Sequence, residues 1–424
     1  MTTLLKDGLV FTKNGFVKKD LFVSSEKAFF VPQNSVTSTI DCSNKIIIPG
    51  FIDVHVHFRE PGFFYKETIK TGTMAALRGG YTTVCTMPNL KPQPSNKDNL
   101  QIQLDIINRD AQCNVIPYGT ITENQDGRSA IIDMESIKDD VCAFSDDGKG
   151  MQTRELMKEA MLKAKQLNKL IVAHCEDETL LHGGCIHEGK WAKEHGYIGI
   201  CSESEYKQVE RDIDIVRETG CGYHICHVST KESVELVRQA RKEGLDVTCE
   251  TAPHYLTMCE DDMKEEGRFK MNPPLRSKED QEALIKGIQD GTISIIATDH
   301  APHSQEEKEK GLVGSPFGIV GLETSFPVLY TKLVKTGIIS LERLLELMCI
   351  NPAKRFNLEG GYIEDGSIAN LAIIDLDKEF SIDSNTFFSK GKATPFDGWK
   401  VYGEVCYTIY KGEIRYDKEH PFSR

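Results

Sequence analysis

The most informative group of possible metal ligands in the sequence is a pair of histidines separated by a single residue. His55 and His57 follow an apolar run, and alternate side chains of an extended segment share one face, so the two imidazoles can chelate one ion. His174 and His227 end two further strand-like runs, and Asp299 ends another. Such ligands at strand ends are typical of a zinc site with an open coordination position. The pattern predicts a metal-dependent hydrolase.

Each of these residues also has a purely structural interpretation. A His-x-His pair can lie on the surface, a histidine such as His174 can be a satisfied core residue, and Asp299 can cap a helix. The combination favours the metal site, because all the strand ends would meet on the rim where barrel enzymes build their active sites.

Two neighbouring aspartates, Asp146 and Asp147, end another strand-like run. Burying both carboxylates without cations is costly, so one of them could bridge two metal ions. An Asp-Gly turn is the structural alternative. Six candidate ligands suit two bridged metals better than one tetrahedral ion, which takes four. The residues by themselves do not choose between the two aspartates.

Three polar residues close to the same strand ends could bind an anionic substrate. Arg59 lies two residues after His57 and can hold a carboxylate with a bidentate fork. Asn89 could donate an amide to that carboxylate, and His303 lies just beyond Asp299. A surface arginine and a turn asparagine are the alternatives.

The elements that would position these residues alternate between strand-like and helix-like patterns from about residue 46 to residue 300. The strand-like runs are mostly unalternating and β-branched, as in strands buried on both faces. They are Ile46–His57, Thr82–Met87, Asn114–Thr120, Val141–Ser145, Leu170–His174, Tyr223–His227, Asp246–Glu250 and Thr292–Thr298. The expected helices include Thr153–Asn168, Val234–Arg241 after a capping box at Ser229–Glu232, and Glu279–Gln289 with Ser277 as its cap.

Eight strand–helix units in series predict an α/β fold, a (β/α)8 TIM barrel. The alternative is an open doubly wound sheet. The ligand pattern favours the barrel, because His55 on the first strand and Asp299 on the eighth must meet, and closure makes those strands neighbours.

Both ends of the chain are expected to form short strands. Turns are predicted at Lys6–Gly8 and Lys13–Gly15. We expect residues 1–46 and 358–424 to pair into one small β-sandwich-like domain beside a barrel of residues 47–357. The polar segment Gln305–Gly311 is expected to be a solvated loop, and the longer loop Gln305–Ser315 could order over a substrate.

Composition narrows the function further. The 424 residues carry a formal net charge of -13, which argues against nucleic-acid and membrane surfaces. No apolar run is long enough for a bilayer span, and no signal peptide is evident. The 13 cysteines lack zinc-finger spacing and suit a reduced, cytoplasmic setting.

Several motifs together resemble bacterial class I dihydroorotase, a branch of the amidohydrolase superfamily. The resemblance covers essentially the whole chain. The matching segments are 53–62 (DVHVHFREPG), 87–89 (MPN), 144–148 (FSDDG), 173–176 (AHCE), 227–229 (HVS), 272–276 (NPPLR), 297–303 (ATDHAPH) and 316–324 (PFGIVGLET).

The resemblance implies a role for each candidate residue. Two zinc ions would be held, one by His55, His57 and Asp299 and the other by His174 and His227. Asp147 would bridge them, since its spacing to His174 matches the family's bridging residue. No lysine stands at that strand end, so the carboxylated lysine of many relatives is not expected. The substrate contacts implied are Arg59, Asn89 and His303 for an α-carboxylate, and Asn272, Phe317 and Gly318 for ring amides.

The implied reaction is the reversible cyclisation of N-carbamoyl-L-aspartate to L-dihydroorotate in pyrimidine biosynthesis. A zinc-activated hydroxide would attack the ring amide, with Asp299 as general acid and base. We also expect a homodimer, and association with aspartate carbamoyltransferase is possible. The rivals are allantoinase or a hydantoinase, whose neutral rings would not require Arg59 and Asn89, and an inactive scaffold, which would be expected to have lost ligands.

Overall fold

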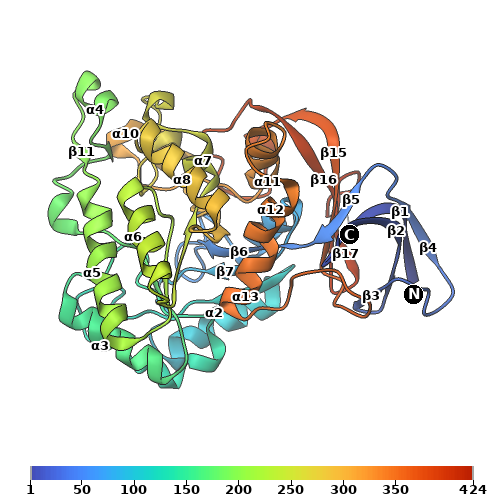
Figure 1. The fold of residues 1–424 in the computed structure, drawn as a ribbon, viewed down its shortest axis with the longest axis horizontal. Helices are drawn as coiled ribbons and strands as arrows, with labels where there is room; N and C mark the ends of the chain where they lie inside the picture. The colour runs from blue at the N-terminus through green and yellow to red at the C-terminus, as the bar shows by residue number, and fades with distance from the viewer. Residues whose placement is uncertain (1, 423–424) are drawn as a thin grey trace.

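The computed structural model describes residues 2–422 and contains a barrel of parallel strands beside a second, mostly antiparallel sheet (Figure 1). The barrel strands form two hydrogen-bonded groups, β6-β7-β8 and β14-β13-β12-β9. Their bounds are β6 Phe51–Val56, β7 Tyr81–Thr86, β8 Asn114–Pro117, β9 Ile171–Ala173, β12 Tyr223–Ile225, β13 Val247–Thr251 and β14 Ile295–Ile296.

Short parallel bridges join the two groups into a ring. Phe144 pairs with Gly119 on one side and with Ile171 on the other, so it takes the place of the fourth strand. Val56 pairs with His300, which closes the ring between the first and eighth positions. The predicted barrel is confirmed, and the open-sheet alternative is wrong.

The predicted first strand, Ile46–His57, is not continuous. Its first part, β5 (Ile46–Pro49), belongs to the second sheet, and β6 begins the barrel after Gly50. A Cβ at Gly50 would lie 2.2 Å from the Thr82 hydroxyl oxygen, so only glycine fits where the chain crosses between the sheets.

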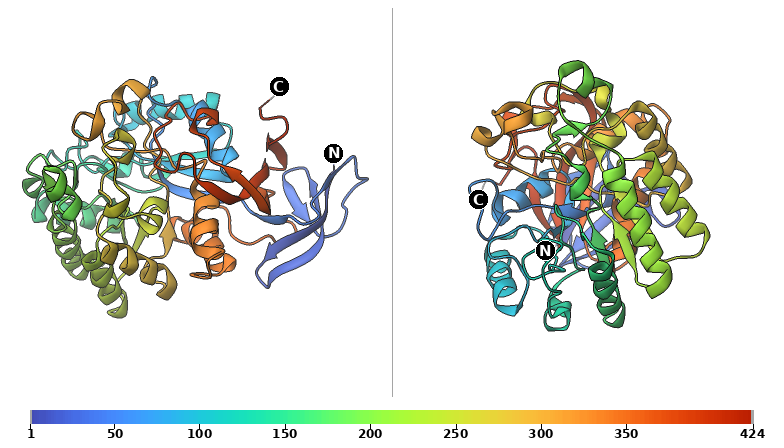
Figure 2. Two further views of the ribbon diagram at one scale, coloured as in Figure 1. Left: turned by 90° about the horizontal axis from the view of Figure 1, so that it is seen from above. Right: turned by 90° about the vertical axis from the view of Figure 1, so that its left-hand side faces the viewer.

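The second sheet combines both ends of the chain, which Figure 2 shows together at one end of the molecule. Its order is β17-β16-β15-β5-β1-β2-β3, with β4 on β1. The predicted turn at Lys6–Gly8 is wrong, because β1 runs through it with a register shift between Leu5 and Gly8. The remaining bounds are β1 Thr2–Thr12, β2 Gly15–Ser24, β3 Lys27–Phe29, β4 Ser38–Asp41, β15 Leu371–Ser381, β16 Lys400–Tyr410 and β17 Glu413–Asp417, and a small separate pair is β10 Ile186–His187 with β11 Gly199–Ile200.

Helices surround the barrel, and none formed by residues 2–422 is long and apolar enough to cross a bilayer. The longer ones are α1 Ile69–Arg78, α2 Lys97–Asp110, α3 Arg154–Gln166, α5 Glu203–Thr219, α6 Lys231–Lys242 and α8 Lys278–Asp290. The shorter ones are α4 Lys190–His195, α7 Pro253–Thr257, α9 Gln305–Lys308, α10 Gly311–Gly314, α11 Ser325–Leu329, α12 Leu341–Leu345 and α13 Asn351–Phe356.

Side-chain caps set several helix starts. The Ser277 hydroxyl accepts from the Asp280 amide and begins α8 as predicted. The predicted cap at Ser229 is wrong, because Thr230 caps α6 and the Ser229 hydroxyl bonds to the buried Glu205 carboxylate instead.

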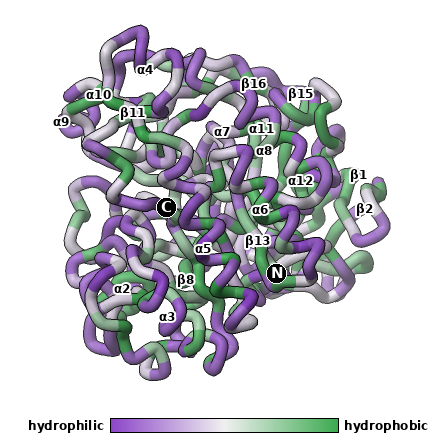
Figure 3. The backbone as a smooth tube through the Cα atoms, turned by 60° about the vertical axis from the view of Figure 1, so that its left-hand side comes forward, coloured by the Kyte–Doolittle hydropathy of each residue, from purple (hydrophilic) through white to green (hydrophobic). Residues whose placement is uncertain are grey.

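The segment Gln305–Gly311 also differs from its prediction as a solvated loop. It begins with α9, which Ser304 caps and which Figure 3 colours as hydrophilic. Lys308, the last residue of α9, is nevertheless only 7% exposed.

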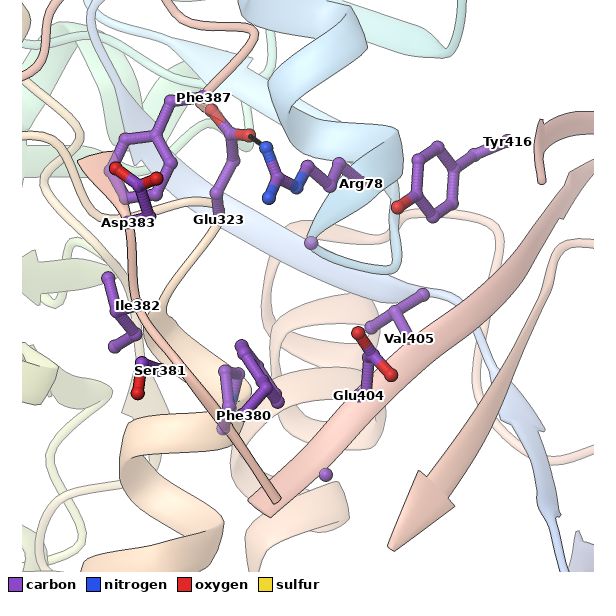
Figure 4. A pocket seen from close by; sticks show the side chains of 13 residues that line it. Arg78, Glu323, Phe380, Ser381, Ile382, Asp383, Phe387, Glu404, Val405 and Tyr416 are labelled. Atoms are coloured by element: carbon purple, nitrogen blue, oxygen red, sulfur yellow. Dashed lines mark hydrogen bonds and ion pairs between the residues drawn. The ribbon is translucent and has the colours of Figure 1, made fainter. Parts of the chain in front are cut away.

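An ion pair joins the barrel to the chain's C-terminal part. Arg78, at the end of α1, donates to the buried Glu323 carboxylate at 3.0 Å (Figure 4). Glu323 also accepts from the backbone amides of Phe388 and Ser389, both at 3.1 Å. One buried carboxylate thus holds α1 against the segment that follows β15.

Candidate functional site

The six predicted metal ligands converge at the carboxyl ends of the barrel strands. His55 lies on β6 and His57 just after it, and their Nε2 atoms are 3.4 and 3.1 Å from the Asp299 Oδ1. Nδ1 of His174 is 3.0 Å from Nε2 of His227. All of these side chains are buried.

Asp147 lies between the two histidine pairs. Its carboxylate oxygens are 3.4 to 3.7 Å from one nitrogen of each of the histidines His55, His57, His174 and His227. A carboxylate with histidines on both sides has the geometry that a bridging ligand needs.

Asp146 has a different environment. Its carboxylate accepts from the backbone amides of Ile121, Thr122 and Gly127 at 2.7 to 3.2 Å, and from the Thr122 hydroxyl. These bonds occupy the carboxylate in bracing the neighbouring loop. The structure therefore presents Asp147, and not Asp146, to the four histidines.

Unpartnered buried atoms test whether this cluster fits metal ions. Nε2 of His55 and Oδ1 of Asp147 are buried without a hydrogen-bond partner. Buried polar atoms are normally paired, so such atoms need a missing ligand. Three sets bring their ligand atoms within 4.8 Å of one another: His55, His57 and Asp299; Asp147, His174 and His227; and His55, Asp147 and Cys226. Imidazoles and carboxylates in sets of three fit zinc.

Two buried glutamates contact the candidate ligand histidines His55 and His174. Glu250 accepts from Nδ1 of His55 at 2.7 Å, which leaves Nε2 of His55 facing the two aspartates. Glu176 lies 3.4 Å from Nε2 of His174. Carboxylates in this position fix the histidine tautomer and ring orientation. The sequence interpretation missed both residues, although a carboxylate ending the buried strand Asp246–Glu250 required a polar partner.

The acidic and basic groups of the cluster strongly shift one another's pKa values. Burial works to lower the pKa of His55, but the Asp147 and Asp299 carboxylates outweigh it and raise that pKa well above its usual value. Burial works to raise the pKa of Asp299, but the His55 and His57 imidazoles outweigh it and lower that pKa to about 2. Asp299 is therefore ionised at neutral pH and able to accept a proton.

Three site residues adopt backbone conformations that are rare for side chains with a Cβ. The φ angles of Arg59, His227 and Asp299 are 58°, 31° and 49°. Such angles persist only where surrounding contacts impose them, and they cluster at functional sites. The three residues closely follow the barrel strands β6, β12 and β14.

Two cationic side chains, Arg59 and Lys66, surround His303 beside the candidate metal ligands. Arg59 donates to the Pro302 carbonyl at 3.2 Å and is 3.4 Å from Nε2 of His303. Lys66 donates to Nδ1 of His303 at 3.2 Å. Burial, with the Arg59 and Lys66 charges, lowers the pKa of His303 to about 2, so its imidazole is neutral. These cations could compensate the charge of a ligand carboxylate.

The other predicted substrate contacts hold protein partners in this structure. Asn89 donates to the Asp147 carbonyl at 2.6 Å, and Asn272 donates to Glu176 at 2.9 Å. The Oδ1 atoms of both asparagines are buried without partners. The Phe317 carbonyl accepts from His303 at 2.8 Å, and Gly318 follows it with φ of 133°. Asn89 thus lies beside Asp147, and the Phe317 carbonyl lies beside His303.

The arrangement supports hydrolysis at a bond close to a substrate carboxylate. Four imidazoles and two carboxylates can hold two divalent cations, and one of the carboxylates, Asp299, can carry a proton. The neighbouring guanidinium and histidine can fix an anionic group.

Comparisons of the sequence with known proteins all identify dihydroorotases as relatives. A family model described as "Dihydro-orotase-like" matches residues 44–233. The chain is 51% identical over 421 residues to a dihydroorotase of Fusobacterium nucleatum subsp. nucleatum, covering 98% of this chain and 99% of that protein. It is 49% identical over 425 residues to a dihydroorotase of Bacillus cereus, covering 99% of each.

Solved structures share the whole fold. An L-hydantoinase (dihydropyrimidinase) from Arthrobacter aurescens superposes with a TM-score of 0.88 at 28% identity, covering 98% of this chain and 96% of that one. A dihydropyrimidinase from Brevibacillus agri superposes with a TM-score of 0.87 at 22% identity, covering 100% and 96%. At this identity the second match supports the fold alone.

Proposed function

The chain belongs to the dihydroorotase family of the amidohydrolase superfamily, and from this premise we propose how its residues catalyse the family's reaction. It is a cyclic amidohydrolase of pyrimidine biosynthesis that interconverts N-carbamoyl-L-aspartate and L-dihydroorotate with loss or gain of water. The observation that carries the proposal is the Arg59 guanidinium, which lies 3.4 Å from His303 and close to the Asp147 and Asp299 carboxylates of the histidine–aspartate cluster.

We infer that the resident metal is zinc, with two ions per chain. His55, His57 and Asp299 would hold one ion, and His174 and His227 the other. Asp147, which faces all four imidazoles, would bridge them. When bound, zinc acidifies water and polarises a carbonyl group.

Asp299 moves the proton in this proposal. In the hydrolytic direction water adds to the ring carbonyl carbon, the C–N bond breaks, and the ring nitrogen must gain a proton. Asp299 is ionised, and it would take the proton from the attacking water and deliver it to that nitrogen. In the biosynthetic direction the same transfers run in reverse.

The substrate would be fixed at two places. Arg59, Asn89 and His303 would hold its α-carboxylate, which places the reactive amide over the ligand cluster. Asn272 and the Phe317–Gly318 backbone would contact the ring amides. Holding both ends restricts the substrate to a reactive orientation.

The setting of the enzyme is also proposed. All 13 cysteines are unpaired, which suits a reducing, cytoplasmic location. We propose a homodimer and an association with aspartate carbamoyltransferase; sedimentation of the chain alone and with that enzyme tests both.

Ring opening tests the assignment. We would compare L-dihydroorotate with allantoin and dihydrouracil, and determine zinc on the same sample. Turnover of dihydroorotate alone with close to two zincs per chain is expected. Activity only on the neutral rings, which the L-hydantoinase likeness would favour, would refute the carboxylate role of Arg59 and Asn89. Bound zinc without any activity would favour a scaffold.

A further inference from the structure

Lys308 is a buried lysine in a segment that is otherwise strongly hydrophilic. Its ammonium group donates to three backbone carbonyls: those of Lys270 at 3.1 Å, Pro316 at 2.9 Å and Gly318 at 2.7 Å. An ammonium has three N–H donors, so every one of them is used.

No carboxylate among residues 2–422 lies within ion-pair distance of the Lys308 ammonium. The preceding residue, Glu307, pairs with Lys66 at 2.9 Å instead. A buried charge held only by carbonyl dipoles is expensive to desolvate. A lysine kept in this position is therefore expected to have a role beyond filling space.

The three carbonyls belong to the two segments proposed to contact the substrate ring. Lys270 lies two residues before Asn272, and Pro316 and Gly318 flank Phe317. The same Lys270 carbonyl also accepts from the Gly318 amide at 3.0 Å. Both backbone groups of Gly318 are thus fixed, one by Lys270 and one by Lys308.

The conformation of Gly318 explains why this backbone needs fixing. Its φ of 133° is open only to glycine, and a Cβ there would lie 2.6 Å from the Ala301 carbonyl oxygen. Glycine also leaves the backbone with more freedom to lose when it is ordered. Contacts from outside must therefore hold the segment in place.

We propose that Lys308 is a positioning residue for the substrate ring: its ammonium clamps the Pro316–Gly318 backbone to Lys270, so that Phe317 and Asn272 keep the separation the ring requires. This inference rests on the proposed function for the identity of the ring. A carbonyl oxygen has two lone pairs, so Gly318 can still accept from a substrate N–H while it accepts from Lys308.

The test combines hydrogen exchange with kinetics. Lys308→Met removes the donors and keeps the length of the side chain. Lys310→Gln, at an exposed lysine two residues away, is the matched control. In the substrate-free protein, amides of residues 314–319 should exchange about tenfold faster in Lys308→Met, and not in the control.

The kinetic arm uses L-dihydroorotate. For Lys308→Met we expect KM to rise about tenfold or more, kcat to change by less than about threefold, and zinc content to stay as in the wild type. In Lys308→Ala, added ethylammonium should lower the raised KM, a rescue that a merely structural role would not give. If Lys308→Met does not fold, Lys308→Gln, which keeps two donors, decides by the same measurements.

The possible outcomes separate the two proposals. Unchanged exchange and unchanged KM in Lys308→Met would overturn the positioning role, as would a loss of zinc with a fall in kcat. Faster exchange in Lys308→Met, together with a wild type that does not turn over dihydroorotate, would support the clamp and overturn the assigned substrate.

Discussion

Replacing Glu250 by glutamine tests whether this carboxylate orients His55, a proposed metal ligand. Glu250 ends β13 and is fully buried. One carboxylate oxygen is 2.7 Å from Nδ1 of His55, and the other is 3.1 Å from Nε2 of His224. Burial works to raise the pKa of Glu250, but the His224 and His55 contacts outweigh it and lower that pKa to about 2, so the group is a carboxylate at neutral pH.

The expected loss of metal affinity follows from the hydrogen bond to His55 that the substitution weakens. Glutamine keeps the shape and one acceptor oxygen but removes the negative charge, and a charge-assisted hydrogen bond is roughly twice as strong as a neutral one. Loss of such a partner behind a ligand histidine weakens metal binding about 10- to 100-fold. That range corresponds to about 1.4 to 2.7 kcal/mol.

The assay is competition for zinc with a chromophoric chelator. Glu205→Gln is the matched control, because Glu205 is an equally buried carboxylate that instead accepts from Ser229 and Thr230 at the start of α6. We expect weaker zinc binding only in Glu250→Gln. Zinc affinity within twofold of the wild type would refute the orienting role. An equal loss in both variants would mean general destabilisation.

Three further predictions address the proton carrier Asp299, the binding of a substrate carboxylate by Arg59, and the pH dependence of stability. Asp299→Asn should retain zinc while kcat falls about 10²- to 10⁴-fold, measured with L-dihydroorotate; near-normal turnover with zinc retained would remove Asp299 from the proton transfer. Arg59→Met should raise KM about 10- to 100-fold without loss of zinc, and an unchanged KM would rule out a substrate carboxylate at this position. Burial, against the opposing effect of Arg78, raises the pKa of Glu323 to about 7. The stability from this group is then fully present below pH 4.5 and is lost as the pH rises through about 7. The free energy of unfolding of the wild type should therefore fall by about 3 kcal/mol more than that of Glu323→Gln between pH 4.5 and pH 8, and parallel pH curves for the two proteins would contradict this.

Local patterns in the sequence predicted the barrel and most of the candidate metal ligands that it brings together. Side-chain alternation placed His55 and His57 on one face, and hydrophobic runs located the strand ends. Cap residues such as Ser277 fixed a helix start, because capping involves only neighbouring backbone groups. These features depend on interactions within a few residues, which a sequence displays directly.

Other features were decided only by the tertiary structure. The sequence does not distinguish the roles of Asp146 and Asp147. Their environments differ because backbone amides of residues 121–127 bond only to the Asp146 carboxylate. The role of Glu250 depends on its hydrogen bond with His55, which lies 195 residues away in the sequence. The sequence around Lys308 predicts a solvated charge, but three carbonyls from two neighbouring segments surround its ammonium group. In each case the deciding partner is brought in by barrel closure or loop packing, and a buried polar group takes its role from whichever partner satisfies it.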